Sequence, residues 1–262
     1  MKKLFVATII LCISTACVAQ NSFRFGLQGT GGLSWFAPDT KGIENDGVRL
    51  NYNFGLMTDF AIGEGTNYYF ATGLNIATLN GKLKYNDLVY TTPNDSSIFF
   101  QGSSSSKYNL NYLEIPLTLK MRTNEVGYMH YFGIFGVTPG INTRARMELE
   151  QSTSSGTFQP DDELDVADEI RLFKMDLNIG FGVEYNFTGN TFAIASLTYN
   201  NGFTNIFNDE YYELDAATDE VVLADSPTID DGSGNQIPYT AQKGPDWKAQ
   251  ARNIRLTVGI FF

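Results

Sequence analysis

The sequence predicts an all-β protein, an eight-stranded antiparallel up-and-down transmembrane β-barrel with short periplasmic turns and long extracellular loops. Three observations predict this fold. Residues 171–186 alternate between apolar and polar side chains, seven further segments share this period of two, and the connections alternate between short and long. A period of two is typical of strands whose two faces meet different surroundings.

The clearest of these segments covers residues 171–186. Its odd positions hold Phe173, Met175, Leu177, Ile179, Phe181, Val183 and Tyr185, and its even positions hold Lys174, Asp176, Asn178, Gly180, Gly182, Glu184 and Asn186. The polar face mixes opposite charges, amides and glycines, which suits a narrow enclosed lumen where charges pair. If the polar face is enclosed, the apolar face must point outward into lipid.

The first four segments cover residues 23–35, 50–62, 67–84 and 108–122. On their apolar faces, the first segment carries Phe25, Leu27 and Trp35, and the second carries Tyr52, Phe54 and Leu56, among others. The third carries Tyr68, Phe70 and Ile76, and the fourth carries Leu113, Leu117 and Leu119. Their polar faces carry Arg24 and Gln28, then Asn53 and Asp59, then Tyr69 and Asn75, then Tyr112, Glu114, Pro116 and Lys120. Pro116 has no N–H to donate to a strand ladder, so we expect an irregularity there.

The last four segments cover residues 128–147, 171–186, 191–205 and 251–262. The fifth, seventh and eighth carry Phe135, Val137 and Ile141, then Ala195, Leu197 and Tyr199, then Ile254, Leu256 and Val258 on their apolar faces. Opposite these lie His130, Thr138, Arg144 and Arg146, then Ser196 and Asn200, then Arg255 and Thr257. Four apolar residues break the polar-face rule, and we interpret them as filling of the lumen or as a local bulge: Phe132, Ile134, Phe192 and Ile194.

The connections supply independent support. Three are of hairpin length and rich in Gly and Asn, at residues 63–66, 123–127 and 187–190. Four are long, at about residues 36–49, 85–107, 148–170 and 206–250. Short turns at one end and long loops at the other are typical of outer-membrane barrels.

A secreted soluble barrel that holds a lipophilic ligand is the alternative, since it has the same period with the faces reversed. The strict segregation of loop lengths favours the membrane barrel.

Residues 1–19 match an export signal, which leaves residues 20–262 as one outer-membrane β-barrel domain. Lys2 and Lys3 form the charged start, residues 4–13 the apolar core, and Cys17-Val18-Ala19 a cleavage site. Lipid attachment at Cys17 is an alternative, although Ser14 stands where such sites usually carry Leu. Both cysteines of the chain lie in this segment, so we expect a mature protein without a thiol, disulfide or cysteine metal site.

The composition agrees with a barrel and argues against nucleic acid as a partner. Aromatic residues make up 14% of the chain while the mean hydropathy is only −0.16, a pairing that alternating strands produce. The net charge is −11, whereas binding to phosphates requires clustered Lys and Arg.

The stretch Tyr112-Leu113-Glu114-Ile115-Pro116-Leu117-Thr118-Leu119-Lys120 resembles a hallmark of the PorT-like outer-membrane β-barrel family of Bacteroidetes-type bacteria. A Gly-rich strand follows it in that family, as residues 133–140 do here, and the closing aromatic Phe262 is also similar. The resemblance implies an eight-stranded barrel in the outer membrane of a Gram-negative bacterium, surrounded by outer-membrane lipid and inserted by the barrel-assembly machinery. The namesake takes part in type IX secretion and gliding, but fold analogy supports a function only by association.

Charged residues on the predicted polar faces form a candidate lumenal network: Asp59, Glu114, Lys120, Arg144, Lys174, Asp176, Glu184 and Arg255. An eight-stranded barrel is only wide enough for its own side chains, and an unpaired buried charge is costly. We therefore expect paired charges that plug the lumen, with a narrow ion path as the alternative.

We find no catalytic motif and expect no enzyme and no cofactor. His130 is the only histidine, and Phe132 occupies the position two residues later, where a barrel lipid deacylase of this size places a partner serine. Proteases of the omptin type use ten strands and pairs of acids with histidines, which the sequence does not offer.

The long loops carry most of the negative charge. Oxygen-bearing side chains at Asp230, Asp231 and Asn235 have turn spacing but lack the closing glutamate of an EF-hand, so they are weak candidates for a metal site. Aromatic residues lie among the acids as candidates for protein contact: Phe207, Tyr211, Tyr212 and Tyr239. The alternative is a solvated loop.

The sequence therefore favours a non-catalytic outer-membrane barrel with a structural or surface-interaction role. The alternatives are an accessory component of a secretion or transport system, with a surface or secretion-system protein as its partner, or a narrow pore.

Overall fold

The computed structural model describes residues 23–39, 43–63, 67–92, 95–153, 156–158, 164–189, 191–208, 212–215, 221–223, 228–230, 236–238, 241–242 and 248–262. The export signal predicted at residues 1–19 lies outside them. Within these ranges, no helix is long and apolar enough to cross a membrane.

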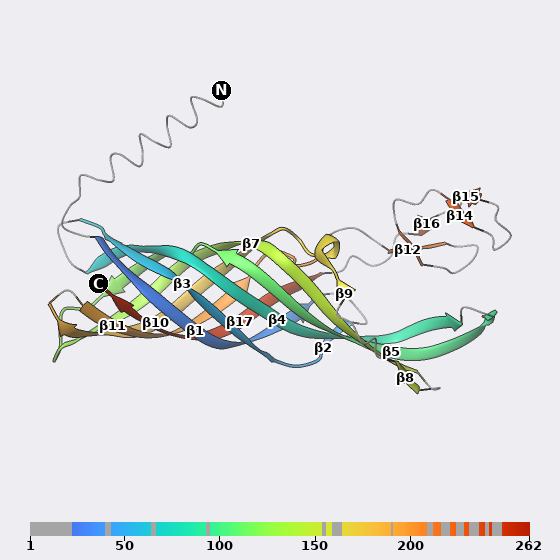
Figure 1. The fold of residues 1–262 in the computed structure, drawn as a ribbon, viewed down its shortest axis with the longest axis horizontal. Helices are drawn as coiled ribbons and strands as arrows, with labels where there is room; N and C mark the ends of the chain where they lie inside the picture. Colours follow the sequence, from blue (N-terminus) through green and yellow to red (C-terminus); the bar gives the residue numbers. More distant parts are fainter. Residues whose placement is uncertain are drawn as a thin grey trace, which may run out of the picture.

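Eight antiparallel wall segments close into a barrel (Figure 1). We call each of them a stave: seven are single strands, and one consists of two consecutive strands. The staves are β1 (Phe23–Pro38), β3 (Arg49–Ala61), β4 (Tyr68–Thr92), β5 (Asp95–Glu114) continued by β6 (Leu117–Arg122), β7 (Met129–Thr153), β10 (Phe173–Thr188), β11 (Thr191–Gly202) and β17 (Ala249–Phe261). Their order is β10-β11-β17-β1-β3-β4-β5-β7, and the pairing of β10 with β7 closes the ring. The predicted eight-stranded antiparallel barrel is confirmed.

The fourth stave is interrupted at Pro116, which lies between β5 and β6. The Ile115 N–H still donates to the Pro139 carbonyl at 3.0 Å, and the ladder to β7 resumes at Leu117. The missing N–H of proline therefore coincides with the expected irregularity.

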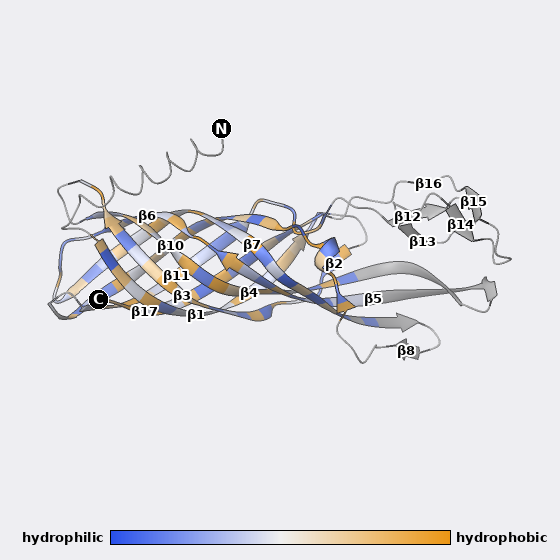
Figure 2. Ribbon diagram, turned by 45° about the horizontal axis from the view of Figure 1, so that its top comes forward, coloured by the Kyte–Doolittle hydropathy of each residue, from blue (hydrophilic) through white to orange (hydrophobic). Residues whose placement is uncertain are grey.

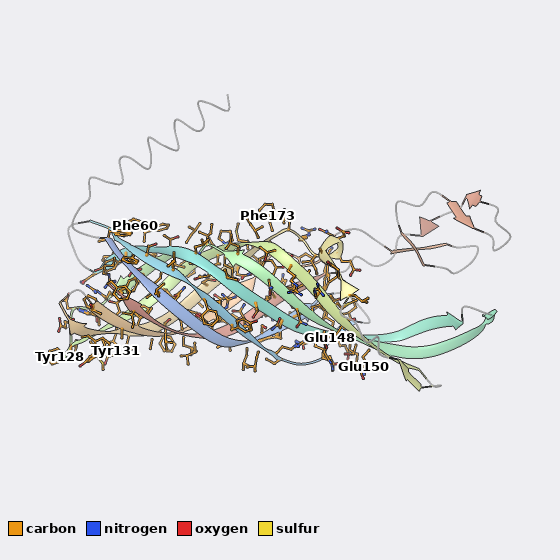
Figure 3. The ribbon with its side chains drawn as sticks, viewed as in Figure 1. Phe60, Tyr128, Tyr131, Glu148, Glu150 and Phe173 are labelled. Carbon is orange, nitrogen blue, oxygen red and sulfur yellow. The ribbon has the colours of Figure 1, made fainter. Side chains whose placement is uncertain are left out.

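The two faces of the wall separate as the alternation predicts. Leu177 is 38% exposed on the outer surface, whereas its neighbour Asp176 is 2% exposed in the lumen. In Figure 2 hydrophobic and hydrophilic bands alternate along the strands of the barrel, and in Figure 3 the labelled side chains of Phe60 and Tyr131 project outward. The apolar outer belt is the surface that meets lipid in a barrel of this kind.

The hairpin between β6 and β7 shows how tight the short-turn end is. Its two central residues, Gly127 and Tyr128, have φ values of +57° and +67°. Positive φ at both central positions is the signature of a type I′ turn, whose twist matches that of the flanking strands. The Tyr128 carbonyl accepts a hydrogen bond of 3.0 Å from the Asn186 N–H, which ties this turn to β10.

The opposite end differs from the predicted long loops, because strands continue where loops were expected. The β4 backbone runs on to Thr92 and pairs with β5 as far as Thr92↔Asp95, with a register shift after Thr91↔Phe99. Much of the loop predicted at residues 85–107 is therefore a hairpin beyond the barrel (Figure 1). Long strands can keep pairing outside the membrane, since hydrogen bonding does not require the apolar belt.

Short elements complete this end. They are β2 (Ile43–Asn45), β8 (Gly156–Phe158), β9 (Leu164–Asp165), the 3₁₀ turn η1 (Ala167–Glu169), β12 (Tyr212–Asp215), β13 (Val221–Leu223), β14 (Thr228–Asp230), β15 (Gln236–Pro238) and β16 (Ala241–Gln242). The last five form a three-stranded and a two-stranded sheet within the predicted loop 206–250.

Candidate functional site: the filled lumen

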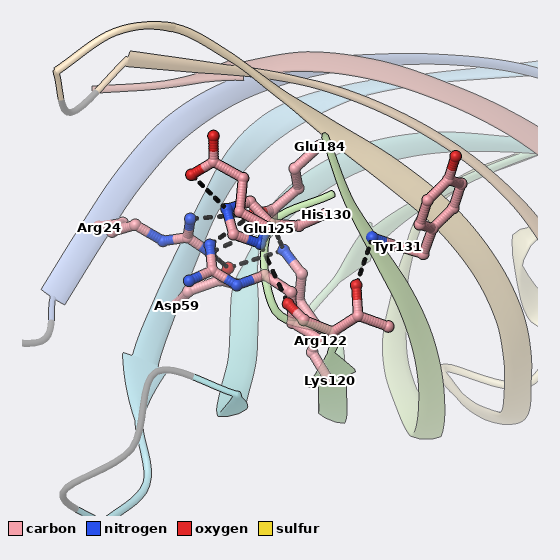
Figure 4. A network of polar contacts seen from close by, with 9 residues as sticks. Arg24, Asp59, Lys120, Arg122, Glu125, His130, Tyr131 and Glu184 are labelled. Atoms are coloured by element: carbon pink, nitrogen blue, oxygen red, sulfur yellow. Dashed lines mark hydrogen bonds and ion pairs between the residues drawn. The ribbon is translucent and has the colours of Figure 1, made fainter. Parts of the chain in front are cut away.

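Five charged side chains cross the lumen near the short-turn end, and we name them the lower cluster (Figure 4): Arg24, Asp59, Lys120, Arg122 and Glu184. Arg24 Nη2 lies 2.7 Å from Asp59 Oδ2, and Arg24 Nη1 lies 3.1 Å from Glu184 Oε2. Lys120 Nζ lies 2.8 Å from Asp59 Oδ2 and also bonds Glu184. Arg122 Nη1 lies 2.9 Å from Glu184 Oε2. The cluster joins β1, β3, β6 and β10 across the barrel interior.

The lower cluster has three cations and two carboxylates, and aromatic rings surround the surplus positive charge. The Arg24 guanidinium carbon lies 4.6 Å from the centre of the Tyr69 ring and 4.8 Å from that of Phe261. Lys120 Nζ lies 4.5 Å from the centre of the Phe132 ring. Ring faces attract cations, most strongly where water is excluded. This accounts for Phe132 on the polar face of β7.

Four further charged side chains form an upper cluster: Glu114, Lys174, Asp176 and Arg255. The Arg255 guanidinium donates two hydrogen bonds to the Glu114 carboxylate, at 2.8 and 3.0 Å. Lys174 Nζ lies 2.7 Å from Glu114 Oε1 and also bonds Asp176. All four side chains are buried, and their charges sum to zero. Such a balanced and bidentate arrangement meets the requirement that buried charges be paired.

A cavity of about 120 Å³ lies between the two clusters. Its lining includes Asp59 and Lys120 from one cluster and Glu114 and Arg255 from the other. Polar side chains bridge the wall at this level: the Gln28 amide donates to Asn75 Oδ1 at 2.7 Å, and the hydroxyls of Thr30 and Thr257 are 2.9 Å apart.

An apolar plug fills the lumen on the long-loop side of the upper cluster. Its buried members are Phe36, Leu79, Leu83, Tyr108, Leu110, Tyr112, Ala145, Val166, Ile170, Ile206, Phe207, Ala249 and Ala251. The Tyr108 ring packs against both Phe36, at 5.9 Å between ring centres, and Phe207, at 5.4 Å. Four of the members come from the segments after the staves, so the connections themselves help to close the barrel.

A family model described as "Outer membrane protein beta-barrel domain" matches residues 18–208. The chain belongs to this family of outer-membrane β-barrels. The family is that of proteins in the outer membrane of Gram-negative bacteria, which agrees with the apolar outer belt. A comparison with curated proteins found no match.

Solved outer-membrane barrels resemble the chain along most of its length. Ail, the attachment invasion locus protein of Yersinia pestis, has 12% identity and a TM-score of 0.33, and the match covers 92% of this chain and 99% of Ail. Neisserial surface protein A has 9% identity and a TM-score of 0.35, covering 91% and 97%. The outer membrane protease OmpT from Escherichia coli has 10% identity and a TM-score of 0.34, covering 92% and 95%.

Within this outer-membrane barrel, Arg144 is not where the alternation predicts. It was expected in the lumen but is exposed on the outer surface. The register of β5 against β7 shifts by one residue between Asn111↔Arg144 and Tyr112↔Asn142, which makes Thr143 an extra residue. A bulge of one residue reverses which positions face inward, so Ala145 is buried while Arg144 and Arg146 lie on the outer face.

Phe207 was expected as a partner contact, and this expectation is wrong, because the side chain is buried in the apolar plug. The side chains of the other loop candidates lie outside the described part of the chain. These are Tyr211, Tyr212 and Tyr239 for protein contact, and Asp230, Asp231 and Asn235 for metal. Elsewhere, in the ranges that the structure covers, no group of three or more His, Cys, Asp or Glu side chains could hold a metal ion.

His130 faces the lumen at the short-turn end. Its Nδ1 lies 3.0 Å from the Thr123 carbonyl oxygen, and its Nε2 lies 3.8 Å from Glu125 Oε2. The carbonyl can only accept, so the Nδ1 nitrogen carries the proton of this bond. Phe192 packs beside the ring at 6.2 Å between ring centres. These contacts fix the ring in the wall of the barrel.

Two members of the lower cluster, Arg24 and Arg122, were absent from the predicted network. Arg24 lies on the polar face that the sequence assigns to the first segment, so the alternation was sufficient to include it. Arg122 stands two residues after Lys120, on the same face of the same strand. Extending the period of two to the last residue of that segment identifies it.

Proposed function

We propose that this outer-membrane barrel is a non-catalytic scaffold with a closed lumen, which presents strands beyond the membrane for interaction at the cell surface. The observation that carries the proposal is the continuation of the β4–β5 ladder far past the outer belt. The belt on these strands ends at Ile76 and Leu113, whereas β4 continues to Thr92. At about 3.3 Å per residue, sixteen further residues extend about 50 Å.

The filled lumen supports a scaffold rather than a pore. The lower cluster, the upper cluster and the apolar plug lie one above another, and each joins staves that are not neighbours. Barrels of eight strands have room only for their own side chains. The charged side chains form ion pairs with one another across the interior. Such pairs favour a rigid wall over the passage of ions.

A trimmed hairpin tests the proposal. Lys84 and Ser105 are opposite each other in the ladder, so residues 85–104 can be replaced by Asn-Gly, which favours a two-residue turn. The full-length and the trimmed protein are crosslinked in intact cells and purified with their partners. We expect the trimmed barrel to fold and to lose the proteins that the full-length barrel captures at the cell surface.

Membership in the PorT-like subgroup is a further part of this proposal, supported by the stretch from Tyr112 to Lys120. An accessory role in secretion predicts the opposite result of the same experiment. Its partners would contact the periplasmic turns, so they would remain on the trimmed barrel. Retention of every partner would overturn the surface role.

A further inference from the structure

The bulge at Thr143 creates a polar patch on the outer face of the barrel, directly beyond the apolar belt. Three residues in register form the last apolar row across β4, β5 and β7: Ile76, Leu113 and Ile141. The next row outward in register is Thr78, Asn111 and Arg144, and the one after it is Asn80, Asn109 and Arg146. Successive rows on one face are about 7 Å apart.

These two polar rows line a hollow of about 220 Å³ together with Tyr52. Seven residues line it, and they carry two guanidinium groups, three amides, a threonine hydroxyl and a tyrosine: Tyr52, Thr78, Asn80, Asn109, Asn111, Arg144 and Arg146. The Thr78 hydroxyl donates to the Tyr52 carbonyl at 3.2 Å and the Asn80 amide to the Leu50 carbonyl at 2.7 Å, so both side chains are held in place. The hollow contains no carboxylate, although the net charge of the chain is −11.

The carboxylates nearest in the ladder already have partners. Glu148 Oε1 accepts a hydrogen bond from the Asn109 side-chain amide at 3.5 Å, and Asp165, opposite Arg146, accepts one from the Ala167 N–H at 3.1 Å. In the third row, Lys107 Nζ lies 3.4 Å from Glu148 Oε2, and Lys82 Nζ lies 2.6 Å from Asp46 Oδ2. Glu148 and Glu150 lie at the end of the barrel from which the long strands extend (Figure 3). Among the residues that the structure describes, no carboxylate forms an ion pair with Arg144.

The position of the hollow selects its ligand. It lies where the lipid-facing belt ends on the long-loop side, which is the headgroup level of the outer leaflet. Guanidinium groups bind phosphate through parallel hydrogen bonds, and amides and hydroxyls complement the hydroxyl groups of sugars. Basic pockets at this level are suited to anionic lipid headgroups.

We propose that the hollow binds the phosphorylated sugar headgroup of an outer-leaflet glycolipid, with Arg144 holding the phosphate and Asn109 and Asn111 contacting the sugar. The bulge serves this site, since without the extra residue Arg144 points into the lumen. The site is independent of the surface role proposed above, because it requires only the orientation of the barrel in its membrane.

Native mass spectrometry of the full mature protein in detergent tests the site, with diphosphoryl lipid A as the probe. We expect the unmodified protein to retain one lipid and Arg144→Ala to lower its occupancy about tenfold or more, as for loss of a charged hydrogen bond. The matched control is Arg252→Ala on β17. Arg252 is opposite Trp35 and Asn201 in the ladders and does not line the hollow, so we expect nearly unchanged occupancy.

Three results would overturn the proposal. They are an equal loss in Arg252→Ala, equal binding of dephosphorylated lipid A by the unmodified protein, and displacement of the lipid by inorganic phosphate alone. If Arg144→Ala does not give a folded, heat-modifiable band, a photoreactive lipid A on the unmodified protein decides. It should label residues 78–80, 109–111 and 144–146, and labelling around Arg252 instead contradicts the site.

Discussion

Ile179 lies at the centre of the lipid-facing row of β10, which runs from Phe173 to Phe187, and it is 55% exposed. We expect Ile179→Arg to lower the free energy of unfolding by about 2–4 kcal/mol, because a charge at the bilayer midplane loses its hydration. The matched control is Leu113→Arg in the last apolar row, where the cost falls to about 0–1 kcal/mol. Urea titration of both variants in lipid vesicles measures the difference. Equal costs would contradict the assignment of the belt.

Glu114 has a different energetic role, since it is the carboxylate that both cations of the upper cluster share. Glu114→Gln leaves Lys174 and Arg255 with less counter-charge in a buried site, and we expect a loss of about 3–5 kcal/mol. The control is Glu148→Gln, which removes the partner of Lys107 at the rim, where such pairs contribute about 0–1 kcal/mol. The same urea titration compares them. A small effect at Glu114 would mean that water reaches the upper cluster.

On β7 the period of two fails at Thr143, so Arg144 lies outside the lumen, whereas Lys174, Asp176, Glu184 and Arg255 on other strands are buried inside it. Asn142, Thr143 and Arg144 are all polar, so an extra residue among them changes no apolar position that the period could detect. In the sequence, only Ala145 at an inward position could have indicated the bulge. Its small side chain hardly changes the apolar–polar pattern. Local sequence therefore predicts the face of a residue only between irregularities of the ladder.

At the scale of elements, the apolar plug depends on close fit between strands. Gly81 on β4 gives room to the Phe36 ring of β1, since a Cβ added there would lie 2.4 Å from Phe36 Cδ2. We expect Gly81→Ala to destabilise the barrel by about 1–3 kcal/mol, as overpacking does. Phe36→Leu in the same chain should restore part of this loss, because it shortens the clashing side chain.

The control for this pair is Gly31→Ala on β1, where no atom lies within 4 Å of the added Cβ. A double-mutant cycle on the free energy of unfolding measures the coupling of Gly81 with Phe36. Additive effects of the two substitutions would show that the plug relaxes without contact between these positions.

The plug was not predicted from the sequence, for a physical reason. On β4 and β5 the inward residues change from polar to apolar at Ala77 and Tyr112, which are opposite each other in the ladder. The period of two does not distinguish apolar residues that point inward from those of the outer face. Ile206 and Phe207 stand alone in an acidic segment without any period. Ile206 and Phe207 are buried because they lie over the end of the closed barrel. Only the tertiary structure reveals this position.

The stretch from Tyr112 to Lys120 has a structural explanation at the scale of the whole molecule. Tyr112 belongs to the plug, Glu114 to the upper cluster and Lys120 to the lower cluster, and Pro116 interrupts the stave between them. One side of the barrel wall, β5 continued by β6, thus supplies all three layers of the filled lumen. In this chain the stretch is therefore a signature of the closed barrel, and it supports the fold more directly than any pathway.

The three layers lead to a prediction on conductance. We expect the purified protein in planar lipid bilayers to show no steady current, because ion pairs and the apolar plug occupy the lumen. The double variant Lys120→Ala/Phe36→Ala lacks one side chain of the lower cluster and one of the plug. If these layers block the lumen, this variant should show brief channel openings in the same current recording. Stable open channels of the unmodified protein would favour the narrow pore instead.

The longest connection should be separable from the barrel, provided that the cut spares the plug. The Asn208 N–H donates to the Glu169 carbonyl at 2.9 Å, and its side chain donates to the Asp168 carbonyl at 2.6 Å, so the chain is anchored up to this residue. Replacing residues 209–245 by a Gly-Ser linker removes no member of the plug or the belt. We therefore expect a barrel that remains heat-modifiable on a gel and unfolds at nearly the same urea concentration.

The matched variant begins the same replacement at Ile206 and so removes Ile206 and Phe207 as well. It should be less stable by several kcal/mol, because two large buried side chains leave a cavity against Tyr108. Crosslinking in cells then shows whether the segment from 209 to 245 or the hairpin of β4 and β5 captures the surface partner. If both replacements unfold at the same urea concentration, the loop residues close the barrel without stabilising it, and the plug consists of the staves alone.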